Sequence, residues 1–262
     1  MSKVGIGTRL LLSTALSIGA ASALSSAAGA ADILGKAPVQ QQGAASGGPS
    51  SAFWLGGDFK ENVAAGYLGG VYAVNGSLDV PGWLVRGQVT GVGFDFAMPP
   101  APNGHGDFFR GDGAIGYQVF GYGLVAQGFV GVDYEQYDFH PASAGNPALR
   151  DRVGAIFLGR VASTGPGQFP FAIEGQFETG NSDFWVRGRT GVKFGQWTVG
   201  PEAIMLGNVA FDELRLGGFV AYDLARNMSV QANVGYADGI RNDNSGRGGN
   251  GVYGGMTFVF LH

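Results

Sequence analysis

The sequence predicts an all-β fold: a single transmembrane antiparallel β-barrel of about twelve strands, of the bacterial outer-membrane type. Polar and apolar residues alternate in successive segments of about 8 to 14 residues, the period that places neighbouring side chains on opposite faces of a strand. Glycine accounts for 49 of 262 residues and charged residues for only 14%, whereas a typical soluble domain has roughly 7% glycine and about 25% charged residues. After the N-terminal segment, no apolar run is long enough for a membrane-spanning helix. A closed barrel satisfies these conditions.

The N-terminal segment is typical of a secretory signal peptide, which we assign to residues 1–30. Lys3 and Arg9 precede an apolar run from Leu10, and Ala28-Gly29-Ala30 fits a small-residue cleavage site. The alternative is an N-terminal membrane anchor, but the run is short and diluted by serine and glycine. Residues 31–51 are rich in Gln, Ser, Gly and Pro without periodicity, so we expect a flexible leader before a barrel of residues 52–262.

Charge and cysteine content exclude some classes of protein. Removal of Lys3 and Arg9 with the signal peptide changes the formal charge from −4 to −6, which argues against nucleic acid as a partner. The chain has no cysteine, so neither a disulfide nor a lipid-modified N-terminal cysteine is expected despite export.

Alternating segments separated by turn residues predict the strands of the barrel. We expect twelve of them, an even number as in bacterial single-chain barrels. In chain order they cover residues 52–59, 63–74, 82–96, 110–121, 123–138, 151–163, 168–179, 183–194, 196–206, 211–224, 227–237 and 250–261.

The connections between these strands alternate in length, apart from a short first hairpin at 60–62. With both termini in the periplasm, the outer connections include 98–111, 140–150, 206–213 and 238–251. The inner ones are mostly short, such as Gly121-Tyr122-Gly123 and Gly195-Gln196. Long outer and short inner connections are the asymmetry of outer-membrane barrels.

The same alternation would also fit a soluble barrel with an apolar interior, so it does not by itself show which face of the strands contacts water. There is too little charge to solvate the outside of a soluble barrel, and aromatic residues such as Phe169, Phe184, Phe194 and Trp197 cluster at strand ends. The chain also ends in the alternating aromatic strand VYGGMTFVFLH. We therefore expect the apolar faces to meet lipid and the polar faces to line the lumen.

The segment DFWVRGRTGVKFG (183–195) illustrates this arrangement, since its three cations share one strand face. Glu174 on the preceding strand should lie across from Arg187 or Arg189. The charged side chains could brace a narrow barrel, or they could line a path that selects a passing solute. Positive and negative charges are balanced, which favours the brace. The expected lumen network comprises Arg86, Asp133, Glu135, Arg152, Arg160, Glu174, Glu178, Arg187, Arg189, Lys193, Glu202 and Arg215.

Two tryptophans, Trp54 and Trp185, are expected to point inward, while Trp83 and Trp197 face lipid. An inward indole beside Glu and Arg would suit stacking of a sugar ring, with Tyr72, Tyr253 and Phe219 as neighbours; simple filling of the lumen is the competing interpretation.

No catalytic residue, metal site or cofactor is predicted. His105 and His140 are expected in outer loops and His262 at the terminus, so we expect no strand to carry a histidine of the kind that would activate a nucleophile on a rigid strand end. Asn242, Asp243 and Asn244 lie in a glycine-rich segment whose spacing does not match a calcium loop.

Several glycine-aromatic motifs in this order resemble the cellulose biosynthesis protein BcsS family over nearly all of the mature chain. They are WLGGDF (54–59), GVYAVNGSL (70–78), WLVRG (83–87), GDGAIGYQ (111–118), FVGVDYEQYDF (129–139), FWVRGRTGVKF (184–194), TVGPEAIMLG (198–207) and RLGGFVAYDL (215–224). The resemblance implies an outer-membrane barrel that takes part in making, exporting or anchoring cellulose, and it supplies no catalytic residue.

The expected function is therefore a non-enzymatic accessory of bacterial cellulose biosynthesis or export in the outer membrane, acting as a narrow pore or as a membrane anchor for the secretion apparatus. Its expected partners are outer-membrane lipid and either glucan chains or cellulose secretion components. The alternatives are a general oligosaccharide or small-solute channel and, third, an outer-membrane enzyme.

Overall fold

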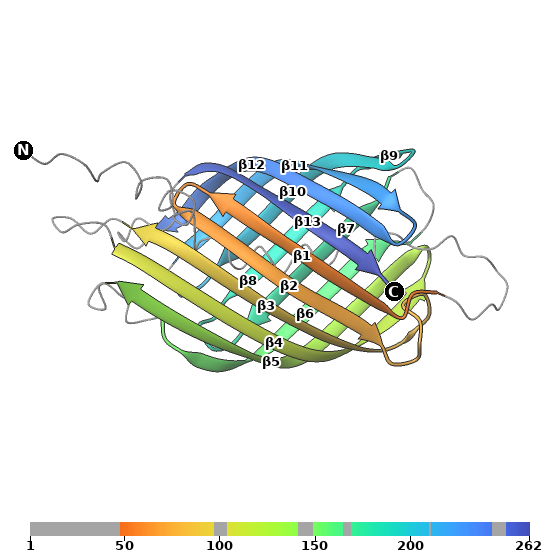
Figure 1. The fold of residues 1–262 in the computed structure, drawn as a ribbon, viewed down its shortest axis with the longest axis horizontal. Helices are drawn as coiled ribbons and strands as arrows, with labels where there is room; N and C mark the ends of the chain where they lie inside the picture. Colours follow the sequence, from red (N-terminus) through yellow and green to blue (C-terminus); the bar gives the residue numbers. More distant parts are fainter. Residues whose placement is uncertain (1–47, 97–103, 141–148, 165–168, 210, 243–249) are drawn as a thin grey trace, which may run out of the picture.

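The computed structural model describes residues 48–96, 104–140, 149–164, 169–209, 211–242 and 250–262. These residues form one antiparallel sheet that closes on itself as a tilted barrel (Figure 1). Its strands are β1 (Ser51–Lys60), β2 (Val63–Ala73), β3 (Gly82–Phe96), β4 (Gly104–Gly121), β5 (Leu124–His140), β6 (Arg152–Ser163), β7 (Phe171–Glu178), β8 (Phe184–Thr190), β9 (Val192–Phe194), β10 (Trp197–Gly207), β11 (Phe211–Ala225), β12 (Met228–Asn242) and β13 (Gly251–Leu261).

Closure confirms the predicted fold class. Apart from β8 and β9, each strand pairs with the next along the chain, and β1 pairs with β13 in the register Ala52 opposite Leu261. β8 and β9 both pair with β10, so they form one interrupted strand and the barrel has twelve. The interruption falls at Gly191, where a Cβ atom would lie 2.7 Å from the carbonyl oxygen of Val199. Only glycine allows this approach of two backbones.

The end of the barrel that holds the described termini carries two-residue turns at 122–123, 195–196 and 226–227. Gly123 and Gly195 have φ angles of 74° and 62°, a region that favours glycine and suits two-residue hairpins. The backbone N–H of His262 donates to the carbonyl oxygen of Ser51 at 2.9 Å. The first and last strands are thereby tied together at this end.

Three strands run further than the alternation predicted. β4 begins at Gly104 although residues 98–111 were expected to connect strands, β5 continues to His140, and β12 continues to Asn242 rather than 237. Beyond the apolar band both faces of a strand can be polar, so the pattern fades while backbone pairing continues.

The proposed signal peptide and nearly all of the leader lie outside the described residues. The end of the leader belongs to the barrel, because β1 begins at Ser51 and the Pro49 carbonyl oxygen accepts from Leu78 N at 2.7 Å. In the described ranges, no helix is long and apolar enough to cross a membrane.

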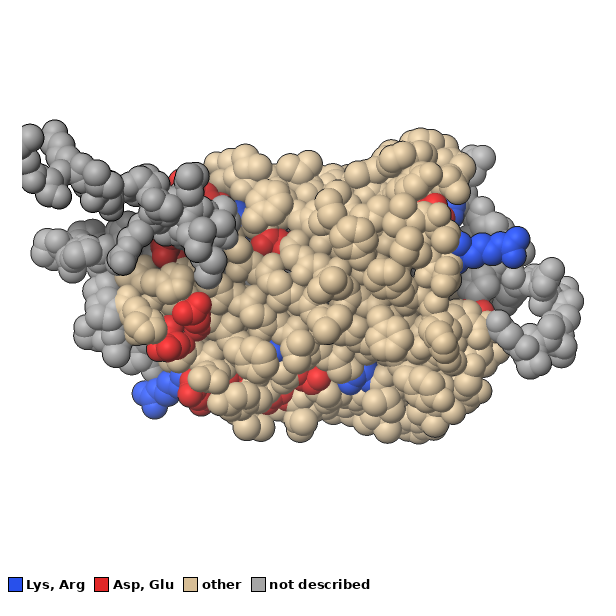
Figure 2. All heavy atoms as spheres, in the orientation of Figure 1, with Lys and Arg blue, Asp and Glu red and all other residues tan. Residues whose placement is uncertain are grey.

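The outer face of the barrel is apolar and its inner face is polar or charged over the middle of the strands. On the outer face of β5, Val130 and Val132 are 51% and 64% exposed. On its inner face, Asp133 and Glu135 are 2% and 0% exposed. The space-filling view shows a surface formed mostly by uncharged residues along the strands (Figure 2). This is the arrangement that a barrel needs in lipid.

Apolar layers lie inside the barrel near both of its ends. At the end that holds the termini, Leu78 from the β2–β3 connection packs on Trp54, Leu84 and Val259. At the opposite end, Leu149 from the β5–β6 connection packs in one cluster with Val63 of β2 and Trp185 of β8. β2 and β8 are opposite walls of a twelve-stranded barrel, so this cluster bridges the lumen.

Candidate functional site

Charged residues line the lumen in addition to these two apolar layers. The predicted residues that lie there with less than a tenth of their surface exposed are Arg86, Asp133, Glu135, Arg160, Glu174, Glu178, Arg187, Arg189, Glu202 and Arg215. Alternation along each strand places these side chains inward, and pairing of neighbouring strands brings opposite charges together.

A chain of ion pairs crosses β6, β7, β8 and β10. Glu174 lies directly opposite Arg187 in the β7–β8 register, as expected, with their side chains 3.7 Å apart. Glu174 also lies 3.7 Å from Arg160. Arg187 Nη2 continues the chain to Glu202 Oε2 at 2.6 Å. The two signs alternate, so the field of each charge is largely offset by its neighbours.

A second group surrounds Trp54 on β1 and β3. The indole Nε1 donates to Gln88 Oε1 at 3.0 Å, and the Arg86 guanidinium lies 5.7 Å from the centre of the ring. Arg86 Nη1 in turn donates to Asp112 Oδ1 at 2.6 Å. The indole nitrogen of Trp54 is therefore hydrogen-bonded inside the lumen, and one face of its ring is covered by a guanidinium group.

A third group, the Lys60 triad, comprises Lys60, Glu213 and Arg215. Lys60 Nζ pairs with one carboxylate oxygen of Glu213, and Arg215 Nε donates to the other at 2.6 Å. Arg215 also lies over the ring of Tyr253, 5.3 Å from its centre. The three charged side chains are at most 3% exposed, and the carboxylate has a cation on each oxygen.

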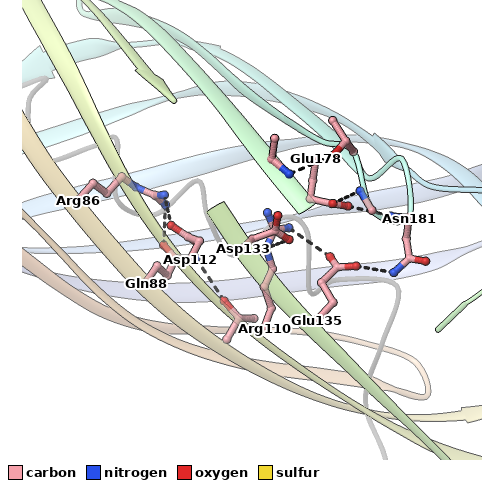
Figure 3. Close-up of polar contacts among 12 residues, drawn as sticks. Arg86, Gln88, Arg110, Asp112, Asp133, Glu135, Glu178 and Asn181 are labelled. Carbon is pink, nitrogen blue, oxygen red and sulfur yellow. Dashed lines mark hydrogen bonds and ion pairs between the residues drawn. The ribbon is translucent and has the colours of Figure 1, made fainter. Parts of the chain in front are cut away.

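The fourth group has an excess of negative charge. This acidic cluster comprises Asp133 and Glu135 of β5, Glu178 at the end of β7 and Asp183 of the β7–β8 connection. Figure 3 shows the first three converging with Arg110 and Asn181. Donor oxygens of Asp133, Glu135 and Glu178 all lie within 4.8 Å of one another.

Few cations or donors balance the acidic cluster. Arg110 approaches Asp133 and Glu135 only to 3.8 Å each. Asn181 Nδ2 donates to Glu135 at 2.6 Å, and Glu178 accepts the backbone N–H groups of Gly180 and Asn181. Within the described residues, both oxygens of Asp133 and of Asp183 lack a hydrogen-bond partner. Burial and the nearby Glu135 carboxylate raise the pKa of Asp183 well above its usual range.

The buried polar atoms without a hydrogen-bond partner, those of the acidic cluster included, lie on one side of the lumen. In the described part of the chain they lie on β4–β8, β10 and the β7–β8 connection, and none lies on β1–β3 or β11–β13. They belong to Arg110, Asp133, Glu135, Arg160, Glu174, Gln176, Asn181, Asp183, Trp185, Arg187 and Glu202. Buried polar atoms require water or an ion where the protein offers no partner.

Two predicted network residues lie at the rims of the lumen. Arg152 is exposed and donates to the carbonyl oxygen of Gly180. Lys193 has a side chain that is 41% exposed and pairs with Asp223 at 3.2 Å. Both have the inward alternation of their strands, but each stands so close to a strand end that its side chain reaches the open end of the barrel.

Trp54 and Trp185 are 1% and 2% exposed, so neither presents a ring face to solvent. Tyr253 and Phe219 also lie inside, and the Arg189 guanidinium is 5.3 Å from the centre of the Phe219 ring. Tyr72 was expected to join them, and that prediction was wrong because it faces outward and is 51% exposed.

The expectation that no strand carries a histidine was also wrong. His105 lies on β4 opposite His140 of β5, and its Nδ1 is 2.9 Å from Asp95 of β3. Asp107 is 3.4 Å from His105 Nε2. The alternation of β4 places this group on the outer face, because the buried Phe108 and Arg110 face inward.

Sequence reasoning missed the inward positions of Lys60, Arg110, Asp112, Asn181, Asp183 and Glu213. Alternation was an available signal for Arg110 and Asp112, since both have the parity of the inward residues of β4. Alternation was also available for Asp183, which begins the expected strand 183–194 with the parity of Arg187. Asn181 lies in a connection, where period-two alternation does not apply.

The pattern of the family described as "Cellulose biosynthesis protein BcsS" matches residues 52–261, so the chain belongs to this family. Solved structures similar to the chain are a KdgM porin (9% identity, TM-score 0.42, covering 80% of this chain and 98% of that one), LpxR from Salmonella typhimurium (10%, 0.49, 80% and 100%) and OmpT, an outer membrane protein of Vibrio cholerae (11%, 0.36, 81% and 98%). No curated protein matches the chain.

Proposed function

We propose that this BcsS-family barrel serves bacterial cellulose production as an outer-membrane anchor for the secretion apparatus and does so without chemistry of its own. The single observation that carries the proposal is the bridging of opposite lumen walls by apolar side chains. Val63, Leu149 and Trp185 form one buried cluster from β2 to β8, and Leu78 closes a second cluster near the other end.

A narrow pore is the competing role, and the charged middle of the lumen is the observation that favours it. Polar linings conduct ions or hydrophilic solutes when water runs through them without interruption. In this barrel apolar layers lie near both ends of the lumen, and the ion pairs from Arg160 to Glu202 alternate in sign, which suits a brace better than a path for one kind of solute. Buried tryptophans likewise favour lumen filling over sugar stacking.

A crosslink across the lumen separates the two roles. The chain has no cysteine, so Val63→Cys with Leu149→Cys, joined by a short bifunctional thiol reagent, fixes the apolar layer in its closed arrangement. We expect cells that carry the crosslinked barrel to secrete as much cellulose as cells with the untreated double variant. Loss of cellulose that depends on the reagent would favour the pore. A single Val63→Cys variant, treated with the same reagent, is the matched control.

A further inference from the structure

We propose that the acidic cluster is a calcium-binding site inside the lumen, with carboxylate oxygens of Asp133, Glu135 and Glu178 as ligands and Asp183 beside them. The site would take one hard divalent cation at the end of the barrel opposite the termini. This proposal is independent of the anchoring role.

The first argument is geometric. Oxygens from β5 and β7 converge to within 4.8 Å of one another, close enough for a single ion to touch all three side chains at the bond lengths of about 2.3–2.6 Å that calcium adopts. Gly154 of β6 keeps the space between them open. A Cβ atom there would collide with Glu178 Oε1 and lie 2.9 Å from Asp133 Oδ1.

The second argument is electrostatic. Among the described residues, the guanidinium of Arg110 lies 3.8 Å from two of the four buried carboxyl groups. Carboxylates at 0–2% exposure are costly to leave charged without a close cation. Elsewhere in the lumen Glu202 and Glu213 each have a cation within 2.6 Å, and Glu174 lies 3.7 Å from two guanidinium groups. The acidic cluster differs from them in its excess of carboxylates over nearby cations.

The third argument concerns Asp183, which lies outside the group of converging ligands. This residue is 1% exposed and, among the described residues, neither of its oxygens has a hydrogen-bond partner. Its carboxyl lies beside that of Glu135. A buried carboxyl group that receives no donor from the described residues and lies near the carboxylates of Glu135 and Glu178 favours a bound cation.

The donor set indicates which cation. Each candidate ligand offers oxygen and none offers nitrogen or sulfur, so a hard cation is preferred over zinc or copper. The ligands are aspartate and glutamate side chains of different length on two strands. Such a set suits calcium, which accepts irregular coordination, better than magnesium, which requires nearly octahedral coordination. Bound calcium would join β5 to β7 and fix the connection that follows β7.

The test is equilibrium dialysis of the folded barrel in detergent, stripped with chelator and then titrated with calcium chloride. We expect a single calcium ion per chain and a rise of about 5–10 °C in the midpoint of thermal unfolding at calcium concentrations about a hundredfold above Kd. Magnesium at the same concentrations should give a smaller shift. Glu178→Gln should weaken calcium binding at least about tenfold, and Asp133→Asn provides a second variant should the first not fold.

The matched control is Glu213→Gln, which removes the same charge from an equally buried carboxylate that already has two cations. This variant should bind calcium as the unaltered barrel does. The proposal is overturned if the unaltered barrel takes up no calcium at about millimolar concentration, or if Glu213→Gln and Glu178→Gln lower the affinity equally.

Discussion

The Lys60 triad and the acidic cluster are two groups of charges buried to the same degree in one lumen, and they satisfy their charges in opposite ways. Glu213 is 0% exposed and has Lys60 on one oxygen and Arg215 on the other. Asp133 is 2% exposed, lies 3.8 Å from Arg110 and accepts no hydrogen bond from the described residues.

This difference in pairing distinguishes charges that stabilise the barrel from charges that can bind a ligand. A carboxylate with cations on both oxygens is complete, and removing a partner costs far more than the pair contributes to stability. A buried carboxylate without such partners retains its affinity for a proton, water or a metal ion. Burial alone therefore does not identify function in a charged lumen, whereas the balance of charges and donors around each carboxylate does.

Arg215→Met tests the completeness of the Lys60 triad and should have the largest effect. The change leaves Glu213 with only Lys60 and removes the guanidinium over Tyr253, so we expect the free energy of unfolding to fall by about 3–5 kcal/mol. Urea titration of the barrel in lipid vesicles, followed by tryptophan fluorescence, measures this fall. A loss below about 1 kcal/mol would show that the triad does not brace the barrel.

Gly154→Ala tests whether the acidic cluster needs the space that β6 provides. The new methyl group would displace the Glu178 carboxylate, so we expect a loss of about 1–3 kcal/mol in unfolding free energy and calcium binding about tenfold weaker. Gly159→Ala on the same strand is the control, because a Cβ atom there meets nothing within 4 Å. Equal effects of the two substitutions would contradict a specific role for the space beside Glu178.

Asp183→Asn tests the charge of the acidic cluster through pH. The pKa of Asp183 is raised in the folded barrel, so the folded state binds the proton more tightly than the unfolded state does. Without calcium, stability should be greatest below the unfolded pKa of about 4 and should decrease as pH rises through the folded pKa. The variant should show a flatter decrease in urea midpoint over the same pH range. A decrease of unchanged steepness would mean that other groups cause it.

Lys193→Ala extends the comparison to an exposed pair and should have the smallest effect. Its partner Asp223 is 3.2 Å away, but the two side chains are 41% and 25% exposed. We expect less than about 1 kcal/mol of destabilisation, diminishing further at high salt. A salt-independent loss comparable to that of Arg215→Met would contradict the distinction between rim and lumen.

The sequence was sufficient to predict the barrel and the facing of most strands. Period-two alternation identified the inward side of β5, β7 and β8, and it placed Glu174 across from Arg187, as the register confirms. These features follow from the alternation itself, because a shift of one residue in strand register would turn a whole apolar face inward.

Alternation placed Asp133, Glu135 and Glu178 inward, but it could not predict the closure of the lumen or the convergence of these carboxylates. Leu78 and Leu149 enter the lumen from connections, and Asn181 joins the cluster from another connection. Which connections fold inward depends on packing between strands distant in the sequence. The group of His105 and Asp95 was missed for a related reason, because β3 and β4 remain paired beyond the apolar band.

Single-channel conductance of the refolded barrel in a planar bilayer tests the closed lumen most directly. Heat-modifiable mobility on a gel first establishes that the protein is folded. A lumen bridged from Val63 to Trp185 predicts a silent bilayer, and it predicts that Trp185→Ala produces conductance whereas Trp83→Ala, on the outer face, does not. Steady conductance by the unaltered barrel, blocked by cello-oligosaccharides, would contradict the anchor and favour a glucan-related pore.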